Sequence, residues 1–263
     1  MPVKFFSIKY KLTVLLILFI VLVCSYSVFA YIMPAEQILD FMVKNFKDVR
    51  TVALVESTVL TSYGIEEKYD EQVWLESPDK YSVKTLGSMI DSDLFTEHLF
   101  RQLFMAGSRE NVERILLSLG IDLSKTSFTR LKGVIAYRIG DKEPGSPKLI
   151  VEKERFLPLL FVYSIPDGQG NEPVTVEFDD YQKKSKNWYP CLITLKKGDD
   201  FTAQYTVKTY QKNIPIDASI LNKFPEYELP AVPEEEDFPA IPWGTPSGDD
   251  SEEMQDNPDV FDE

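Results

Sequence analysis

The chain has 263 residues, two cysteines and a formal net charge of −14. Hydrophobic residues make up 44% of it and aromatic residues 13%, enough for the core of about one domain. The acidic balance argues against a nucleic-acid partner, because nucleic-acid binding needs a basic face.

Residues 1–30 are predicted to be a secretory signal peptide. Three lysines form a basic start, Leu12–Cys24 is an uncharged apolar run, and Val28-Phe29-Ala30 supplies a cleavage site. We therefore expect cleavage after Ala30 and export from the cytoplasm.

Two other fates of this segment stay open. Leu12–Ala30 is nearly long enough to span a bilayer, so an uncleaved inner-membrane anchor is the first alternative. Lipid attachment at Cys24 is the second, although Val23 stands where a lipoprotein signal needs a small residue.

Residues 228–263 hold thirteen acidic residues, six prolines and no Lys or Arg. Because the three lysines of the signal would be lost, the exported chain would carry −17, of which −13 lies in this tail. Such a segment buries too little apolar surface to offset its ordering entropy, so we expect disorder. Solvation of the domain and docking on a basic partner both remain open as its role.

The remaining residues, 31–227, match the size of one domain. Pro34 suits the first turn of a helix. The apolar positions that follow at helical spacing are Ile38, Phe41, Met42 and Phe46. The pattern predicts one amphipathic helix that ends near Asp48, and then a Val- and Thr-rich strand over Thr51–Leu60.

The stretch 71–84 predicts an antiparallel hairpin. Val73 and Leu75 alternate with polar neighbours before a Pro-Asp turn, and Tyr81 and Val83 resume the alternation after it. A period of two gives each strand one apolar face and one polar face.

Asp91–Gly120 changes to helical periodicity and predicts an inserted helical pair. The first helix would stop before Gly107, and Ser108 would cap the second, which ends at Gly120. The apolar residues of the first helix are Leu94, Phe95, Leu99 and Leu103, with His98 on the same side; those of the second are Val112, Ile115, Leu116 and Leu119.

Strand signals then continue to the end of the domain. The predicted strands cover 127–129, 133–140, 148–153, 159–165, 173–178, 189–196 and 201–210. A sheet of this size with few helices must curl to shield its apolar face. We therefore predict an α+β fold: a strongly curved antiparallel sheet, or half-open, incomplete β-barrel, covered by the N-terminal helix and the inserted helical pair.

Residues that could carry catalysis or bind a metal are scarce. Without the signal, Cys191 is the one thiol and His98 the one histidine, so we expect no disulfide, no metal site and no cofactor. The sequence shows no nucleophile elbow and no phosphate-binding glycine loop, and we expect Asp179-Asp180 to lie in a solvated turn. We therefore expect a binding protein rather than an enzyme.

The apolar and aromatic strand residues admit two interpretations. They form a tightly packed core, or they line the concave face of a half-open barrel that has room for acyl chains.

Five short motifs follow one another in a familiar order. They are Val73-Trp74-Leu75-Glu76-Ser77-Pro78-Asp79-Lys80-Tyr81; Gly133 with Tyr137; Leu149–Lys153 leading into Leu157-Pro158; Tyr189-Pro190; and Asn213–Asp217 closing with Phe224. In these motifs, over most of residues 34–226, the chain resembles the periplasmic outer-membrane lipoprotein carrier family, of the LolA/LolB type.

Two features depart from that family. Its members carry a basic residue, important for handing cargo onward, where this chain has Ser77. They also carry an Asp-Gly-x-x-Leu-Trp-x-Tyr strand pair where Asp91–Gly120 predicts helices.

The resemblance implies a monomeric, non-enzymatic carrier in the periplasm of a Gram-negative bacterium. It would bind acyl chains of a lipoprotein or lipid for transfer towards the outer membrane. The candidate cavity lining is Val73, Leu75, Tyr81, Val83, Leu149, Val151, Val174, Val176 and Phe178, and the candidate lid residues are Leu94, Leu99 and Leu103. An inner-membrane release complex and an outer-membrane acceptor would be its protein partners. The alternative is a sensor or structural module of the same fold that binds a protein partner in the cell envelope.

Overall fold

The computed structural model describes residues 32–86, 98–164, 172–184 and 186–224, together with Thr13 and Leu15. The rest of the predicted signal, residues 91–97 of the predicted insert and the acidic tail therefore lie outside the described residues. Within the described part, no helix is both long enough and apolar enough to cross a membrane.

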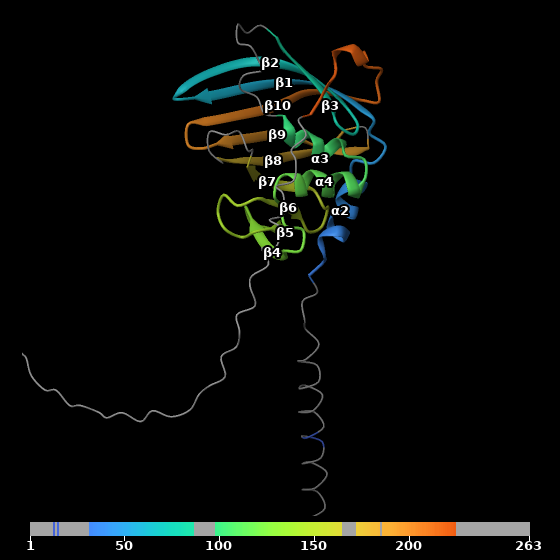
Figure 1. Ribbon diagram of the computed structural model, residues 1–263, viewed down its shortest axis with the longest axis vertical. Helices are drawn as coiled ribbons and strands as arrows, with labels where there is room; N and C mark the ends of the chain where they lie inside the picture. Colours follow the sequence, from blue (N-terminus) through green and yellow to red (C-terminus); the bar gives the residue numbers. More distant parts are fainter. Residues whose placement is uncertain are drawn as a thin grey trace, which may run out of the picture. The chain divides into compact units, whose positions relative to one another are not determined.

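Eleven strands of the described residues form one antiparallel sheet (Figure 1). Their bounds are β1 Thr51–Ser62, β2 Ile65–Glu76, β3 Lys80–Leu86, β4 Thr126–Leu131, β5 Val134–Gly140, β6 Lys148–Glu152, β7 Pro158–Ser164, β8 Pro173–Lys184, β9 Asn187–Lys197, β10 Phe201–Lys212 and β11 Asn222–Lys223. The order across the sheet is β11-β3-β2-β1-β10-β9-β8-β7-β6-β5-β4. The outermost strands β11 and β4 do not pair with each other, so the sheet is an open, incomplete barrel, as predicted.

The helices of the described residues are short and lie mostly on one side of the sheet. Their bounds are α2 Ala35–Lys44, η2 Leu99–Arg101, α3 Gln102–Met105, α4 Arg109–Ser118 and η3 Ala218–Ile220. Figure 1 shows α2, α3 and α4 in front of the same face of the sheet. Their apolar side chains join those of the buried sheet face in one hydrophobic core.

The predicted helical insert is confirmed in its second half. The Ser108 hydroxyl accepts a hydrogen bond from the Asn111 N–H at 3.3 Å and so caps α4. Gly120 follows α4 with φ of +76°, the left-handed conformation that favours glycine at a helix end. The described part of the first half is shorter than the sequence predicts, because it consists of the single turns η2 and α3.

Two predictions from the sequence are corrected. The buried stripe of α2 runs through Ile38, Leu39 and Met42, so Phe41 lies at its border and is 40% exposed. Asp179 and Asp180 do not form a turn, because they continue β8 where longer strands than predicted pair with β9.

Phe224 is the last described residue of the domain, and it is part of the hydrophobic core. Its side chain is buried and stacks on Tyr81, with ring centroids 4.2 Å apart. Its own backbone N–H donates to Asp79 O at 2.8 Å. Phe224 therefore anchors the last strand, β11, against β3.

We predict different outcomes for two truncations. Ending the chain after Tyr227 removes the acidic tail and should leave the thermal midpoint within about 4 °C. Ending it after Leu221 also removes the buried Phe224 ring, and should cost about 3–5 kcal/mol. Thermal and urea unfolding measure both, and equal stability of the two truncations would contradict the assignment of Phe224 as the end of the core.

Candidate functional site

The residues predicted to line a cavity lie on the helix-facing side of the sheet. Seven of them are buried in the common core: Val73, Leu75, Leu149, Val151, Val174, Val176 and Phe178. Tyr81 and Val83 stand on β3 near the sheet edge and are half-buried against the same core. The structure thus brings the predicted residues to one face, which is the candidate site.

This face is filled by the η2–α3 segment, which we define as Leu99–Met105. Phe104 packs edge-on against Phe178 on β8, and its ring centroid also lies 5.3 Å from that of Tyr189 on β9. Phe100 lies 6.0 Å from Phe178 and 5.9 Å from Tyr205 on β10. The segment therefore covers β8, β9 and β10 at the middle of the sheet.

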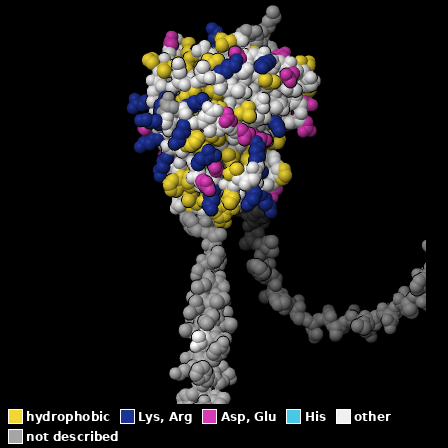
Figure 2. All heavy atoms as spheres, turned by 180° about the vertical axis from the view of Figure 1, so that it is seen from behind, with side chains coloured by type: hydrophobic (Ala, Val, Ile, Leu, Met, Phe, Trp, Pro, Cys, Tyr) yellow, Lys and Arg dark blue, Asp and Glu magenta, His cyan; other side chains and the backbone are white. Residues whose placement is uncertain are grey.

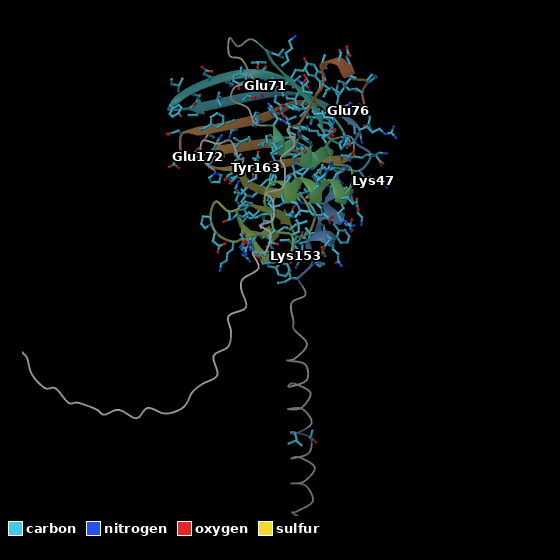
Figure 3. All side chains as sticks on the ribbon, viewed as in Figure 1. Lys47, Glu71, Glu76, Lys153, Tyr163 and Glu172 are labelled. Atoms are coloured by element: carbon cyan, nitrogen blue, oxygen red, sulfur yellow. The ribbon has the colours of Figure 1, made fainter. Side chains whose placement is uncertain are left out.

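The predicted lid residues share this environment where they are described. Leu99 and Leu103 are buried in the η2–α3 segment, and Leu94 lies outside the described residues. Figure 3 shows side chains filling the space between the sheet and the helices. The concave face and its cover are thus packed together in the described state.

A polar cluster stands in the middle of this apolar face. The Arg101 and Glu56 side chains are both 0% exposed, and the guanidinium donates from Nη2 to Glu56 Oε2 at 2.7 Å and from Nη1 to Oε1 at 3.1 Å. The guanidinium also lies over the rings of Phe100 and Tyr205, at 4.8 and 5.2 Å. This bidentate pair links the η2–α3 segment to β1.

Three further residues, His98, Thr58 and Glu71, complete the polar cluster. Arg101 Nε donates to His98 Nδ1 at 3.0 Å, so His98 accepts as a neutral imidazole. The Thr58 hydroxyl donates to Glu71 Oε2 at 2.7 Å. Within the described part of the chain, His98 Nε2 and Glu71 Oε1 are buried without a hydrogen-bond partner.

The low dielectric of this site shifts its ionisation equilibria. Burial, followed by the charge of Arg101, holds the pKa of His98 well below its usual range. Burial raises the pKa of Glu71, although the hydrogen bond from Thr58 and the charge of Arg101 oppose this shift. Burial alone would lower the pKa of Arg101, but Glu56 outweighs it and raises that pKa. Arg101 therefore stays charged and His98 neutral.

Sequence reasoning missed Glu56 and Arg101 and misjudged His98. Glu56 and Thr58 share strand parity with Leu54 and Leu60, so the period of two already placed them on the apolar face. The sequence places His98 on the apolar side of a helix, whereas the structure places it just before η2 as a buried member of the polar cluster. An acid at a buried strand position was the available signal for a buried basic partner.

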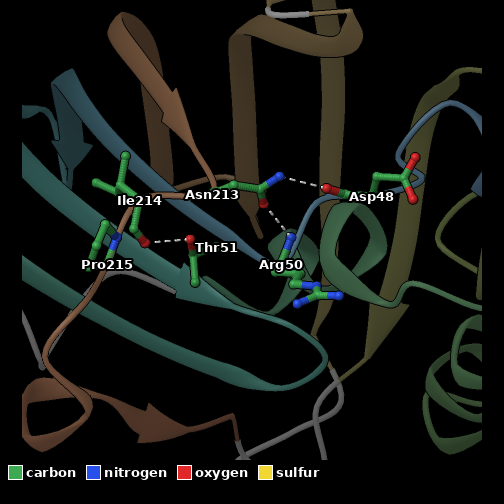
Figure 4. A pocket seen from close by; sticks show the side chains of 6 residues that line it. All are labelled: Asp48, Arg50, Thr51, Asn213, Ile214 and Pro215. Carbon is green, nitrogen blue, oxygen red and sulfur yellow. Dashed lines mark hydrogen bonds between the residues drawn. The ribbon is translucent and has the colours of Figure 1, made fainter.

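A hollow of about 520 Å³ lies outside the concave face (Figure 4). Its polar groups hold two loops together: Asn213 accepts from the Arg50 N–H and donates to Asp48 O, each at 2.8 Å, and the Thr51 hydroxyl donates to Ile214 O. Because these groups are already paired, the hollow is structural and the concave face remains the candidate site.

No family model matches the chain, and no curated protein matches it in sequence. A LolA superfamily protein from Nitrosomonas europaea is similar in structure, with 8% identity and a TM-score of 0.47 over 72% of this chain and 97% of that chain. An outer membrane lipoprotein-sorting protein domain from Vibrio parahaemolyticus follows with 12% identity and a TM-score of 0.42, over 70% and 96%. The Pseudomonas aeruginosa MucA/MucB complex also matches, with 11% identity and a TM-score of 0.23, over 69% and 99%.

We draw no conclusion from likenesses this weak. The strand order itself confirms the open antiparallel sheet that the sequence predicts, and the function is inferred below from the chain's own residues.

We predict that the buried ion pair behaves as a unit. Arg101→Met leaves the Glu56 carboxylate buried without its partner and should lower the free energy of unfolding by about 3–5 kcal/mol. The double variant with Glu56→Met should recover most of that loss, because no unpaired charge remains. Urea unfolding of the single and double variants checks this, and additive losses would contradict it.

We also predict that His98 stays neutral well below pH 6.5. Its folded-state pKa lies below that of the unfolded chain, so it contributes stability that is present above about pH 6.5 and is lost as the pH falls. Because the chain has one histidine, a single imidazole NMR signal reports on this group. Titration of that signal near pH 6.5 in the folded protein would contradict the buried cluster.

Proposed function

We propose that this protein is a non-enzymatic carrier of the bacterial cell envelope that binds acyl chains of a lipoprotein or lipid. The acyl chains occupy the concave face of the sheet after the η2–α3 segment moves away. The observation that carries this proposal is that two phenylalanines of a short, irregular segment fill the apolar face, while a buried ion pair holds that segment.

The chemistry of the face suits an acyl chain. The rings of Phe178, Tyr189 and Tyr205 lie against the segment and are buried. Ile193 and Leu195 are buried in the same core. An acyl chain that replaces Phe100 and Phe104 is transferred from water to this face. The transfer contributes a favourable free energy of about 0.8 kcal/mol for each buried methylene. The site thus offers partition rather than catalysis.

The ion pair makes departure of the segment less costly than an all-apolar contact. A buried pair contributes little net stability, because Coulomb attraction is offset by the desolvation of both charges. When the segment moves off the sheet, the charges of Arg101 and Glu56 become hydrated again. The apolar cargo then replaces the rings of Phe100 and Phe104 on the sheet. The pair therefore fixes where the segment sits more than how tightly it is held.

Gly107 supplies a pivot for this movement. It stands between α3 and α4 with φ of +69°, and a Cβ atom built there would lie 3.4 Å from Ser77 Oγ. Ser77 occupies the position at which the resembled family carries a basic residue. The position linked to cargo transfer in that family therefore touches the hinge of the cover in this chain.

The segment 1–30 and the open sheet together support a role in the periplasm. There the carrier would receive its cargo from an inner-membrane release complex and deliver it to an outer-membrane acceptor. Retention of residues 1–30 as an anchor would instead favour the sensor or structural module.

We predict that Phe104→Ala increases binding of a fluorescent long-chain acyl probe. Removing the ring destabilises the closed state and raises the fraction of protein whose face is accessible, so the apparent affinity should rise several-fold while the thermal midpoint falls. Probe titration and thermal unfolding of the same samples measure both effects.

Leu116→Ala is the matched control. Leu116 is buried on α4, outside the η2–α3 segment, so its loss should lower stability without a gain in affinity. Loss of stability without probe binding in either variant would mean that the face is permanent core, and would favour the module that binds a protein partner.

A further inference from the structure

Four aromatic rings form a continuous row at the β4–β5 end of the sheet, in which Tyr137 is buried and the two end rings are exposed. Phe41 on α2 stacks on Phe156 at 4.8 Å, Phe156 lies 6.0 Å from Tyr137 on β5, and Tyr137 lies 5.1 Å from Phe128 on β4. Phe41 and Phe128, at the two ends of the row, are 40% and 37% exposed, and the neighbouring Ile135 is 47% exposed. Core packing does not explain large apolar groups left in water at one end of the sheet.

Cations cover these rings. Lys44 Nζ lies 4.3 Å from the centre of Phe41, and Lys153 Nζ lies 5.4 Å from the centre of Phe128. Beside them, Arg155 and Lys183 flank the ring of Trp188 at 5.3 and 5.2 Å. We call this surface the aromatic–basic face and define it by Phe41, Lys44, Phe128, Ile135, Lys153 and Trp188.

Backbone contacts join the parts of this face. Lys153 N–H donates to Ile135 O at 3.1 Å, and the Asn45 amide donates to Arg155 O at 2.7 Å. The end of α2, the turn after β6 and the β4–β5 hairpin therefore lie side by side. Figure 3 labels Lys153 at the lower end of the domain, and Figure 2 shows the same end from behind, with hydrophobic, basic and a few acidic side chains.

The charges of this face are available to an outside partner. Lys44, Lys153 and Lys183 make no ion pair with any residue that the structure describes, although the whole chain carries a net charge of −14. Arg155 is paired with Glu152, and Glu154 is exposed in the same turn. The balance of the face is therefore positive in an otherwise acidic protein.

We propose that the aromatic–basic face docks on an anionic phospholipid surface. Aromatic rings sit at the level of the lipid headgroups, and lysine stems lie along apolar surface while their ammonium groups reach the phosphates. Phe41 and Lys44 also stand on the first helix after the apolar run Leu12–Cys24, so an uncleaved form would hold this face close to the bilayer. The inference does not depend on acyl binding, because it concerns exposed side chains at the end of the sheet and not the middle strands beneath the η2–α3 segment.

Trp188 provides a direct readout of docking. The experiment uses the full-length chain with the substitutions Trp74→Phe and Trp243→Phe, which leave Trp188 as its one tryptophan. It is mixed with phosphatidylcholine vesicles, with or without phosphatidylglycerol, that contain lipids bearing a nitroxide near the headgroup. We expect quenching of Trp188 on the anionic vesicles and little on the neutral ones.

Charge and apolar variants test the face itself. Lys44→Gln with Lys153→Gln should weaken binding to anionic vesicles roughly 30-fold, about fivefold for each charge, and Ile135→Ser should weaken it as well. The matched controls are Lys68→Gln with Lys84→Gln, and Ile65→Ser, because these residues are exposed on β2 and β3 at the other end of the sheet. The controls should bind as the parent does.

Two results would overturn the docking proposal. One is the absence of Trp188 quenching on anionic vesicles. This result would also be seen if residues 1–30 alone held the protein to the membrane, because Trp188 would then stay away from the headgroups. The other is an equal loss of binding in the control variants. Binding of an acyl probe by the Lys44/Lys153 variant separates this outcome from failure of the carrier proposal, since the concave face is unchanged in that variant.

Discussion

The buried ion pair between Arg101 and Glu56 determines where the η2–α3 segment lies on the sheet. Both side chains are 0% exposed, and each would be costly to bury alone. The pair therefore fixes the η2–α3 segment against β1 at one position, and the rings of Phe100 and Phe104 follow it onto β8, β9 and β10. Without this pair the short segment has apolar contacts but no fixed register.

An open sheet makes such a cover necessary. Because β4 and β11 do not pair, the described strands leave one apolar face that only helices can shield from water. α2 and α4 have regular amphipathic stripes and cover that face with ordinary packing. The η2–α3 segment covers the middle with two single turns and a polar cluster, and the proposed movement of this segment rests on that difference.

Alternation and capping made much of the fold predictable. The period of two in Val73 and Leu75, the cap at Ser108 and the stop at Gly120 all depend on local rules, and the structure follows them. Phe41 and Arg101 depend on tertiary neighbours instead. Phe41 lies at the surface, where it stacks on Phe156 from a distant part of the chain. Arg101 is buried because Glu56 pairs with its charge. Single-sequence patterns do not carry these pairings.

Hydrogen exchange of the η2–α3 segment, with and without a long-chain fatty acid, tests the carrier account most directly. If the segment is a movable cover, the backbone amides of Leu99–Met105 should exchange faster than those of β8 and β9 in the free protein. Addition of the fatty acid should change the exchange of the segment and slow that of the strands beneath it. Protection of the segment equal to that of β8 and β9, unchanged by the fatty acid, would show a fixed core element and contradict the account.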